Sequence, residues 1–290
     1  MISTRRIVYV LFMLLLPRIV GAQTDPPKTL INSLPRDKTP EQLLALLALN
    51  LGIAESKNGT YDRAIHYFIQ SKRLDPNLLN ARLYLATAHA SRYAPGAAGE
   101  ENVQHGEAAV QEFRETMLIA PENLSAIDGL GSILFQLGKT PFDSTKLEES
   151  RSLFKKHIQL APNDPEPYYW IGVIDWTTSF RARNNLRAQF GESNQDGPLP
   201  EAGPLPPDLR KLYAKEFGPA IDEGIDCMKR AMTLRSDYDD AMAYLNLLFR
   251  RKADTVESPE ERAQFLKMAD DLIDEVKEIK QKRAEQPSHP

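Results

Sequence analysis

Apolar positions recur with the period of an α-helix along most of this chain, in paired segments separated by turn residues. The clearest pair is LGIAESKNGTYDRAIHYFIQSKRLDPN, residues 51–77. Asn58 and Gly59 separate the two apolar segments of this pair, and Pro76 follows the second segment. Because the dipeptide Asn-Gly favours a turn and proline cannot continue a helix, this stretch predicts a helix, a turn and a second helix.

Helix start signals agree with this division. Residues 39–42 (Thr-Pro-Glu-Gln) and 258–261 (Ser-Pro-Glu-Glu) each combine a capping box with proline at the first helical position. Asp164 and Pro165 open a further helix, which contains YYWIGVIDW, residues 168–176. The pattern predicts an all-α protein.

The paired helices carry a repeated set of small and large residues. In the first pair these are Gly52, Ala64, Phe68 and Ser71, followed by Pro76. Helices can cross closely only where side chains are small, and a larger neighbour fills the remaining gap. The set resembles the tetratricopeptide repeat (TPR), a 34-residue helix-turn-helix unit, of an exported bacterial type. In the later units His157, Ser236 and Asn246 depart from the family pattern. The residues at the corresponding positions are Leu85, Ala86, Ala109, Phe113, Thr116 and Pro121; Leu130, Gly131, Ser150, Phe154, His157 and Pro162; Ile171, Gly172, Gly224, Met228, Ala231 and Ser236; and Leu245 with Asn246.

The resemblance implies an α-solenoid over residues 39–285, with insertions between the two helices of a unit. The largest insertion lies in the fourth unit and includes a proline-rich segment, 191–208. The final helix, after Ser258, has an apolar stripe on a charged background and is expected to cap the solenoid. The stripe consists of Ala263, Leu266, Ala269, Leu272, Ile273, Val276 and Ile279. The expected units are about 45–78, 79–123, 124–163, 165–237 and 239–285.

The N-terminus has the layout of a signal peptide over residues 1–22. Arg5 and Arg6 precede an apolar run of about ten residues, and a small-residue ending places cleavage between Ala22 and Gln23. The run is shorter than the roughly 20 residues that span a bilayer, so no stable membrane insertion is expected after cleavage. We therefore expect a periplasmic or secreted protein, with an extended segment at 23–38 and a disordered tail at 286–290.

The composition of the chain excludes some classes of function and of covalent structure. The formal net charge of −4 argues against nucleic-acid binding. The single cysteine, Cys227, excludes an intramolecular disulfide and is expected to be a small buried side chain. His66 is expected on a helix surface, and His157 is expected as a packed core histidine.

Catalytic and cofactor motifs are absent from the sequence. No nucleophile elbow, P-loop, dinucleotide fingerprint, zinc-binding helix motif or paired-cysteine motif occurs, and the histidines lack metal-ligand spacing. We therefore expect no enzyme activity, no cofactor and no metal.

The resemblance implies a binding groove on the concave face, lined by the first helix of each unit. A carboxylate clamp for peptide C-termini is disfavoured, because Leu49 and Ile53 occupy the positions that it needs. The implied groove residues are Asp128, Phe135, Tyr169, Val173, Trp176, Arg250 and Arg251.

Three functions remain open at this point. The leading one is a non-enzymatic module that holds a protein or peptide in the groove, since aromatic residues and arginines are frequent energetic anchors. The alternative is a small-molecule binding protein, for a sugar for example, with an aromatic pocket near 169–176 covered by 177–215. A weaker third is an enzyme that uses Asp128 and Asp175 together. Tyr169 and Trp176 could also simply fill gaps beneath the insertion.

One residue of YYWIGVIDW does not fit the repeat. Asp175 lies on the stacking face with Tyr168, Ile171 and Gly172, where a large apolar side chain is usual. A buried unpaired carboxylate is costly, so Asp175 requires a partner. The sequence does not identify that partner, nor the oligomeric state.

Overall fold

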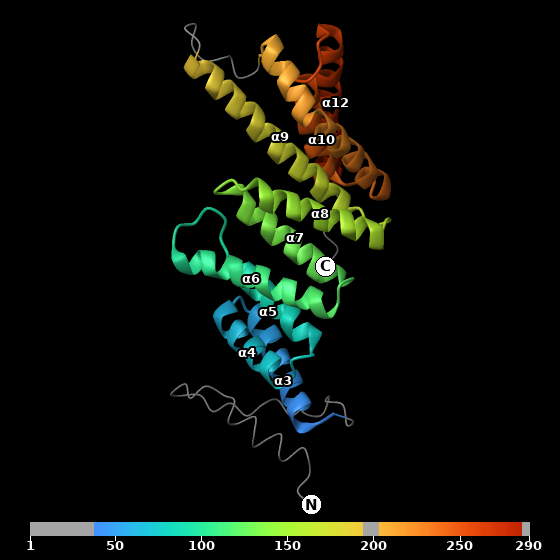
Figure 1. Cartoon of the computed structure of the whole chain (residues 1–290). Helices are drawn as coiled ribbons and strands as arrows, with labels where there is room; N and C mark the ends of the chain where they lie inside the picture. The colour runs from blue at the N-terminus through green and yellow to red at the C-terminus, as the bar shows by residue number, and fades with distance from the viewer. Residues whose placement is uncertain (1–37, 194–202, 286–290) are drawn as a thin grey trace, which may run out of the picture. The chain divides into compact units, whose positions relative to one another are not determined.

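The computed structural model describes residues 38–193 and 203–285, which form ten helices and no strand (Figure 1). The signal peptide predicted at 1–22, nearly all of the extended segment predicted at 23–38, the middle of the proline-rich segment and the predicted tail lie outside the described residues. None of the described helices combines the length and the hydropathy needed to cross a membrane. The helices are α3 (Pro40–Lys57), α4 (Tyr61–Leu74), α5 (Leu79–Arg92), α6 (Glu100–Ile119), α7 (Leu124–Lys139), α8 (Ser144–Leu160), α9 (Glu166–Ser193), α10 (Pro207–Leu234), α11 (Asp239–Ala253) and α12 (Pro259–Glu285).

The helices form two compact units, Met1–Asp143 and Ser144–Pro290. In the first unit, α3 to α7 each pack on the next helix, and α5 also contacts α3 and α7. In the second unit, α8 to α12 follow the same order, and α9 also contacts α11. Contact with the next helix and the next but one is the arrangement of stacked helix pairs. The unit boundaries given by the sequence remain a prediction.

The repeated small residues lie where helices approach most closely. In the first unit, Ala64, Phe68 and Ser71 are fully buried. A Cβ atom added to Gly52 would lie 2.4 Å from Cε1 of Phe68, so only glycine leaves room for that ring. The Ser71 hydroxyl donates to the Ala45 carbonyl at 2.7 Å, which satisfies a buried polar group across the helix pair.

The second unit repeats this packing with different residues. A Cβ atom on Gly172 of α9 would lie 2.5 Å from Cε of Met228 on α10. His157 is 1% exposed, with its Nε2 3.3 Å from Oδ2 of Asp164, which confirms the predicted core histidine. The Trp170 ring stacks on Phe154 of α8, with centroids 5.8 Å apart, and so joins two successive helix pairs.

The long insertion of the fourth unit is largely helical. It lengthens α9 and α10 to 28 residues each, and the two helices pack along each other. Nε of Arg183 on α9 donates to Oδ2 of Asp254 at 2.6 Å, and both side chains are buried. Leu205, just before α10, is 1% exposed. The insertion is therefore anchored by a buried ion pair and an apolar contact.

Both predicted capping boxes occupy helix starts, but only the first is reciprocal. The Thr39 hydroxyl accepts from the Gln42 amide, and the Gln42 side chain accepts from the Thr39 amide. Ser258 accepts from the Glu261 amide at 3.2 Å, whereas its hydroxyl donates to Glu260. Either arrangement satisfies N–H groups that a helix start leaves unpaired.

The predicted apolar stripe of α12 is partly wrong. Ala269 and Leu272 are buried, whereas Ala263 and Ile273 are exposed. Phe265, which the prediction omitted, contacts Phe249 of α11 with ring centroids 6.1 Å apart. The face of α12 that packs on the protein therefore includes Phe265, Ala269 and Leu272 and leaves Ala263 and Ile273 in solvent.

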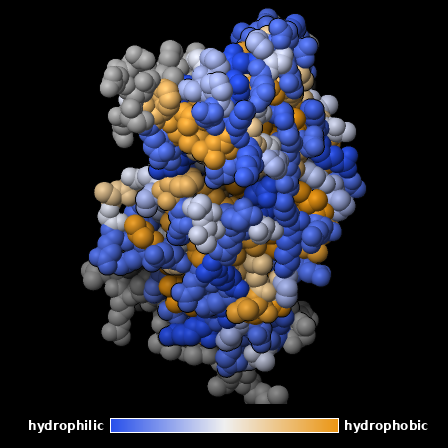
Figure 2. Space-filling view, turned by 45° about the horizontal axis from the view of Figure 1, so that its top comes forward, coloured by the Kyte–Doolittle hydropathy of each residue, from blue (hydrophilic) through white to orange (hydrophobic). Residues whose placement is uncertain are grey.

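Exposed apolar side chains are dispersed on the face drawn in Figure 2, as separate patches among polar residues. The large apolar residues that stay exposed include Leu118 at 83% and Phe180 at 39%. Isolated apolar residues are normal on a surface, so a candidate binding site requires several that adjoin.

Candidate functional site

Aromatic side chains adjoin along α9 and α11 in the second unit. The Tyr169 ring lies 5.2 Å from Tyr238 and 5.7 Å from Tyr244, measured between centroids. The Trp176 ring lies 5.4 Å from Tyr244 and stacks on Phe180 at 5.1 Å. We call these residues the aromatic strip: Tyr238, Tyr169, Tyr244, Trp176 and Phe180.

The helical period explains how α9 contributes three of these rings. Tyr169, Trp176 and Phe180 are separated by seven and four residues, so they lie on one face of the helix. Val173 lies on the same face, between Tyr169 and Trp176 in the sequence. Its side chain is 2% exposed, so it packs beneath the aromatic rings. Tyr238 and Tyr244 come from the start and the middle of α11, which packs against α9.

The strip is partly exposed along its length. Tyr238 is 6% exposed and Phe180 39% exposed, and the rings between them are half-buried. Burial is the main cause that raises the pKa of the Tyr169, Tyr238 and Tyr244 hydroxyls, with nearby acidic groups adding to it for all three. These hydroxyls therefore remain protonated at neutral pH and can donate hydrogen bonds.

The Tyr238 end of the strip is held by a polar cluster. The Tyr238 hydroxyl donates to Oε2 of Glu166 at 2.9 Å, and Arg235 donates to Oε1 of the same carboxylate at 2.7 Å. The Arg235 guanidinium also lies 4.2 Å from the Tyr238 ring centroid. This end presents a carboxylate that is already paired, together with the exposed Asp240.

The Phe180 end of the strip is bounded by arginine. The Arg251 guanidinium lies 5.6 Å from the Phe180 ring centroid, and its Nη1 is 3.4 Å from Oδ2 of Asp254. Its side chain is 12% exposed, and burial lowers its pKa. Arg250 pairs with Asp270 at 2.6 Å. The two predicted groove arginines are thus engaged in ion pairs within the protein, and Arg251 also contacts the Phe180 ring.

The predicted groove residues are not all brought together. Tyr169, Val173 and Trp176 form one face with the aromatic strip, and Arg251 adjoins it. Asp128 and Phe135 belong to α7, in the other compact unit. Asp128 is half-buried, and Phe135 is 6% exposed with the Lys139 ammonium 5.2 Å from its ring centroid.

The sequence interpretation missed Phe180, Tyr238 and Tyr244. Phe180 lies four residues after Trp176, so extending the periodicity past YYWIGVIDW would have found it. Tyr244 lies between the expected groove positions of the last unit and could not be found by counting repeat positions.

The partner of Asp175 is Arg151, on α8. Nε of Arg151 donates to Oδ1 of Asp175 at 2.7 Å, and an Nη atom donates to Glu223 of α10 at 2.5 Å. Asp175 is 2% exposed, and desolvation by burial raises its pKa to about 7 despite the attraction of Arg151. Arg151 has its own pKa raised by Asp175 and Glu223. Burial and the attraction of Arg151 act on the pKa of Asp175 in opposite directions. Burial prevails, because Arg151 shares its charge between the carboxylates of Asp175 and Glu223.

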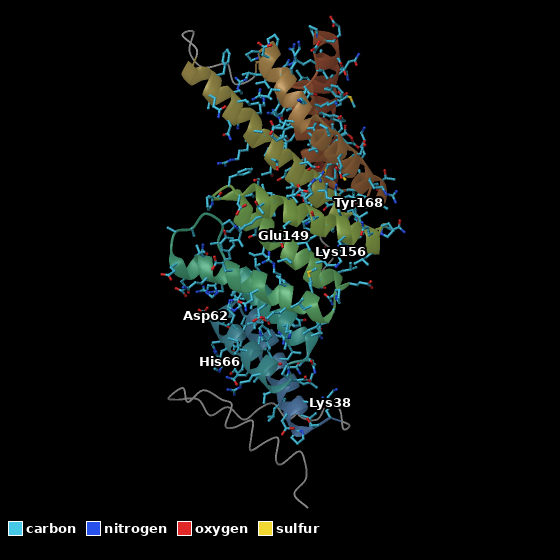
Figure 3. All side chains as sticks on the ribbon, in the orientation of Figure 1. Lys38, Asp62, His66, Glu149, Lys156 and Tyr168 are labelled. Carbon is cyan, nitrogen blue, oxygen red and sulfur yellow. The ribbon has the colours of Figure 1, made fainter. Side chains whose placement is uncertain are left out.

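A large cavity lies on the opposite face of α9 from the aromatic strip. Ile174, Asp175 and Thr178 line it from α9, together with residues of α8 and α10. Glu149 lines it from α8, the helix on which Figure 3 also labels Lys156. Because Tyr169 and Trp176 do not line this cavity, it is not the aromatic pocket near 169–176 of the alternative hypothesis.

Other predicted residues have simple environments. His66 is exposed on α4, which confirms the prediction (Figure 3). Cys227 is half-buried rather than fully buried, and burial raises the pKa of its thiol to about 12. A thiol of that pKa is not ionised at neutral pH and is a poor nucleophile. Within residues 38–193 and 203–285, no three His, Cys, Asp or Glu side chains are close enough to hold a metal ion.

Comparison with solved structures identifies the fold. MamA from Desulfovibrio magneticus RS-1, from residue 41 to its end, matches with a TM-score of 0.53 at 16% identity, covering 82% of this chain and 96% of that one. A second MamA crystal structure matches with a TM-score of 0.51 at 14% identity, covering 85% and 98%. The chain has the tetratricopeptide-repeat fold. The TPR protein YrrB is also similar, with a TM-score of 0.48 at 13% identity over 79% of this chain and 86% of that one.

The TPR fold confirms the fold class expected from the repeated small residues. No family model and no curated protein matches this chain by sequence. At these identities the likeness shows the fold alone, so the function has to be argued from the residues of the chain.

Proposed function

We propose that this TPR-fold chain is an exported, non-enzymatic interaction module that binds a protein or peptide segment along the aromatic strip. One observation carries the proposal: five aromatic rings adjoin across two helices while three of them stay half-buried and one stays 39% exposed. Tyrosine and tryptophan offer a large contact area at a small cost in side-chain entropy.

The ends of the strip favour an elongated occupant. Exposed Asp240 lies near one end, and Arg251 supports the other end. The hydroxyls of Tyr169 and Tyr244 between them are protonated donors, suited to the carbonyl oxygens of a peptide backbone. A segment that lays apolar side chains on Trp176 and Phe180 would match this pattern.

The test uses Trp176 as its own reporter. The chain has two tryptophans, so Trp170→Phe leaves Trp176 as the single tryptophan, which is excited selectively at the red edge of tyrosine absorption. Tagged protein is cross-linked in cells and recovered from the cell envelope, and a recovered partner is then titrated while Trp176 emission is followed. We expect saturable emission changes with the partner and loss of capture in the Tyr169→Ala/Trp176→Ala variant.

The matched control is Leu118→Ala, which removes an apolar side chain that is 83% exposed on α6. This variant should recover the same partners as the wild type. If the Tyr169→Ala/Trp176→Ala variant also recovers them, the strip is not the binding surface. Turnover of a substrate by purified protein would contradict the non-enzymatic part of the proposal.

Export is proposed from residues 1–22 alone. N-terminal sequencing of the protein recovered from the cell envelope should begin at Gln23. A chain that retains Met1 and fractionates with the cytoplasm would refute this part without affecting the binding surface.

A further inference from the structure

The aromatic strip carries hydrogen-bond donors that the described part of the chain does not use. No group in that part accepts a hydrogen bond from the hydroxyls of Tyr169 and Tyr244 or from the indole N–H of Trp176. None of these three atoms is shielded from solvent, so a molecule that lies on the strip can reach them. Tyr238 differs, because its hydroxyl donates to Glu166 at 2.9 Å.

The spacing of the rings matches the repeat of a polyproline II helix. Tyr169 and Trp176 are seven residues apart on α9, which separates them by about 10 Å along the helix axis. The Tyr244 ring lies between them, nearly perpendicular to both, with its centroid 5.7 Å from Tyr169 and 5.4 Å from Trp176. A polyproline II helix has about three residues per turn and rises about 3.1 Å per residue, so side chains on one side recur roughly every 9 Å. Successive turns of such a ligand can therefore pack against Tyr169 and Trp176.

Unused donors on the strip favour a ligand that offers acceptors without donors of its own. Proline carries a carbonyl oxygen and no N–H, and a polyproline II helix has no internal hydrogen bonds, so its carbonyl oxygens stay available. An α-helical ligand uses most of its carbonyl oxygens internally, and an extended strand brings N–H groups that also need partners. Proline rings pack on aromatic side chains at a small cost in backbone entropy, because the proline backbone is already restricted.

One end of the strip carries an acidic group that a ligand can pair with. Asp240 is exposed and lies one turn before Tyr244 on α11. Its charge adds to the raised pKa of the Tyr169 and Tyr244 hydroxyls, so it lies near both. Asp240 has no ion-pair partner among the residues that the structure describes, whereas Glu166 at the same end is paired with Arg235. A basic residue of a ligand would therefore meet Asp240.

We propose that the aromatic strip binds a proline-rich segment of another protein in the polyproline II conformation, with a basic residue of that segment beside Asp240. Prolines three residues apart pack against Tyr169 and Trp176. The carbonyl oxygens between them accept hydrogen bonds from Tyr169, Tyr244 and Trp176. This inference rests on the proposed function and specifies the class of segment that the strip recognises.

The first experiment compares three synthetic peptides by calorimetry with the full chain. All have the same length and one terminal arginine. The first is a run of prolines, the second has alanine in place of the prolines, and the third forms an amphipathic, leucine-rich helix. We expect the proline peptide to bind at least tenfold more tightly than either of the others. Equal or tighter binding of a comparison peptide, or no binding of the proline peptide at millimolar concentration, overturns the proposal.

Substitutions that remove only a hydroxyl locate the donors. Tyr169→Phe and Tyr244→Phe keep both rings and delete hydroxyls that pair with no described residue, so both variants should fold as the wild type does. Each should weaken binding of the proline peptide about threefold to tenfold, the effect of one lost hydrogen bond. The matched control is Tyr84→Phe, at a tyrosine of α5 that is 41% exposed, and it should leave the Kd unchanged. Wild-type Kd values in both strip variants overturn the proposal.

The acidic end is tested with Asp240→Asn. This variant should bind the arginine-tagged proline peptide about twofold to fivefold more weakly at low salt and an untagged proline peptide as tightly as the wild type does. Equal effects on the two peptides, or no effect on either, refute the placement of the basic residue beside Asp240.

A second copy of the chain is the other possible source of prolines, because residues 191–208 are proline-rich. Sedimentation without peptide should give a monomer. A dimer that the proline peptide dissociates overturns the assignment to another protein.

The inference and the proposed function fail in different ways. If Tyr169→Ala/Trp176→Ala loses its cross-linked partners but the proline peptide does not bind the wild type, the strip binds another class of segment and only this inference is wrong. If that variant recovers the same partners as the wild type, the proposed function itself is wrong. Loss of both the partners and the proline peptide in this variant supports the two together.

Discussion

Asp175 provides a quantitative test of the buried charge cluster in the second unit. The perturbation is Asp175→Asn, which keeps the side-chain volume and an oxygen that can accept from Arg151 but removes the ionisable group. The groups that face Asp175 are Arg151 and Lys155 from α8, and Glu223 and Cys227 from α10.

The sign of the effect follows from the direction of the shift. Burial raises the pKa of Asp175 from 3.8 in the unfolded chain to about 7 in the folded one. The folded state therefore binds more protons than the unfolded state between these values, so stability falls as pH rises through this window. At about 1.4 kcal/mol per pH unit, the wild type should lose roughly 2–3 kcal/mol of unfolding free energy between pH 5 and pH 8, relative to the variant.

Urea unfolding followed by circular dichroism at pH 5, 6, 7 and 8 measures this difference. Asp226→Asn, which changes an exposed aspartate on α10, is the matched control and should follow the wild-type pH profile. If the wild type and Asp175→Asn give parallel profiles, Asp175 has an ordinary pKa in the folded protein and the desolvation argument is wrong.

Three further substitutions test the packing. Gly52→Ala should lower the unfolding free energy by about 1–3 kcal/mol in urea titrations, since its Cβ atom would lie 2.4 Å from the buried Phe68 ring, and an unchanged midpoint would contradict this contact. Arg183→Met should cost about 3–5 kcal/mol by leaving buried Asp254 with a weaker partner, and thermal unfolding would show this as a clear loss in Tm. Thr39→Ala should cost about 1 kcal/mol through loss of the capping box, with faster hydrogen exchange at the start of α3 as its signature, and unaltered exchange there would count against it.

The fold could be predicted because its determinants are local. Gly52, Ala64 and Ser71 are small residues at fixed separations, and the structure buries each of them at a close helix approach. Turn and proline signals between the helices act over a few residues, so a single sequence is enough to recognise them.

The site could be predicted only in part, because its contacts join separate helices. Tyr169 and Trp176 follow from helical periodicity, whereas Tyr244 joins them from α11. Arg151 lies 24 residues before Asp175, in the preceding helix, and no local spacing identifies it. Arg251 differs, because Asp254 lies only three residues after it and this local spacing could have indicated the ion pair that leaves Arg251 beside Phe180 rather than as an open cation.

The central claim is that a partner occupies the aromatic strip, and photo-cross-linking from Phe180 tests it most directly. Replacing Phe180 with benzoyl-phenylalanine puts a reactive ketone on an aromatic residue that is 39% exposed at the end of the strip. The control places the same group at Leu212 of α10, which is 48% exposed. We predict a discrete cross-linked partner from position 180 that is absent from position 212 and is lost with Trp176→Ala. Equal yields from both positions, or no adduct at position 180, would contradict the claim.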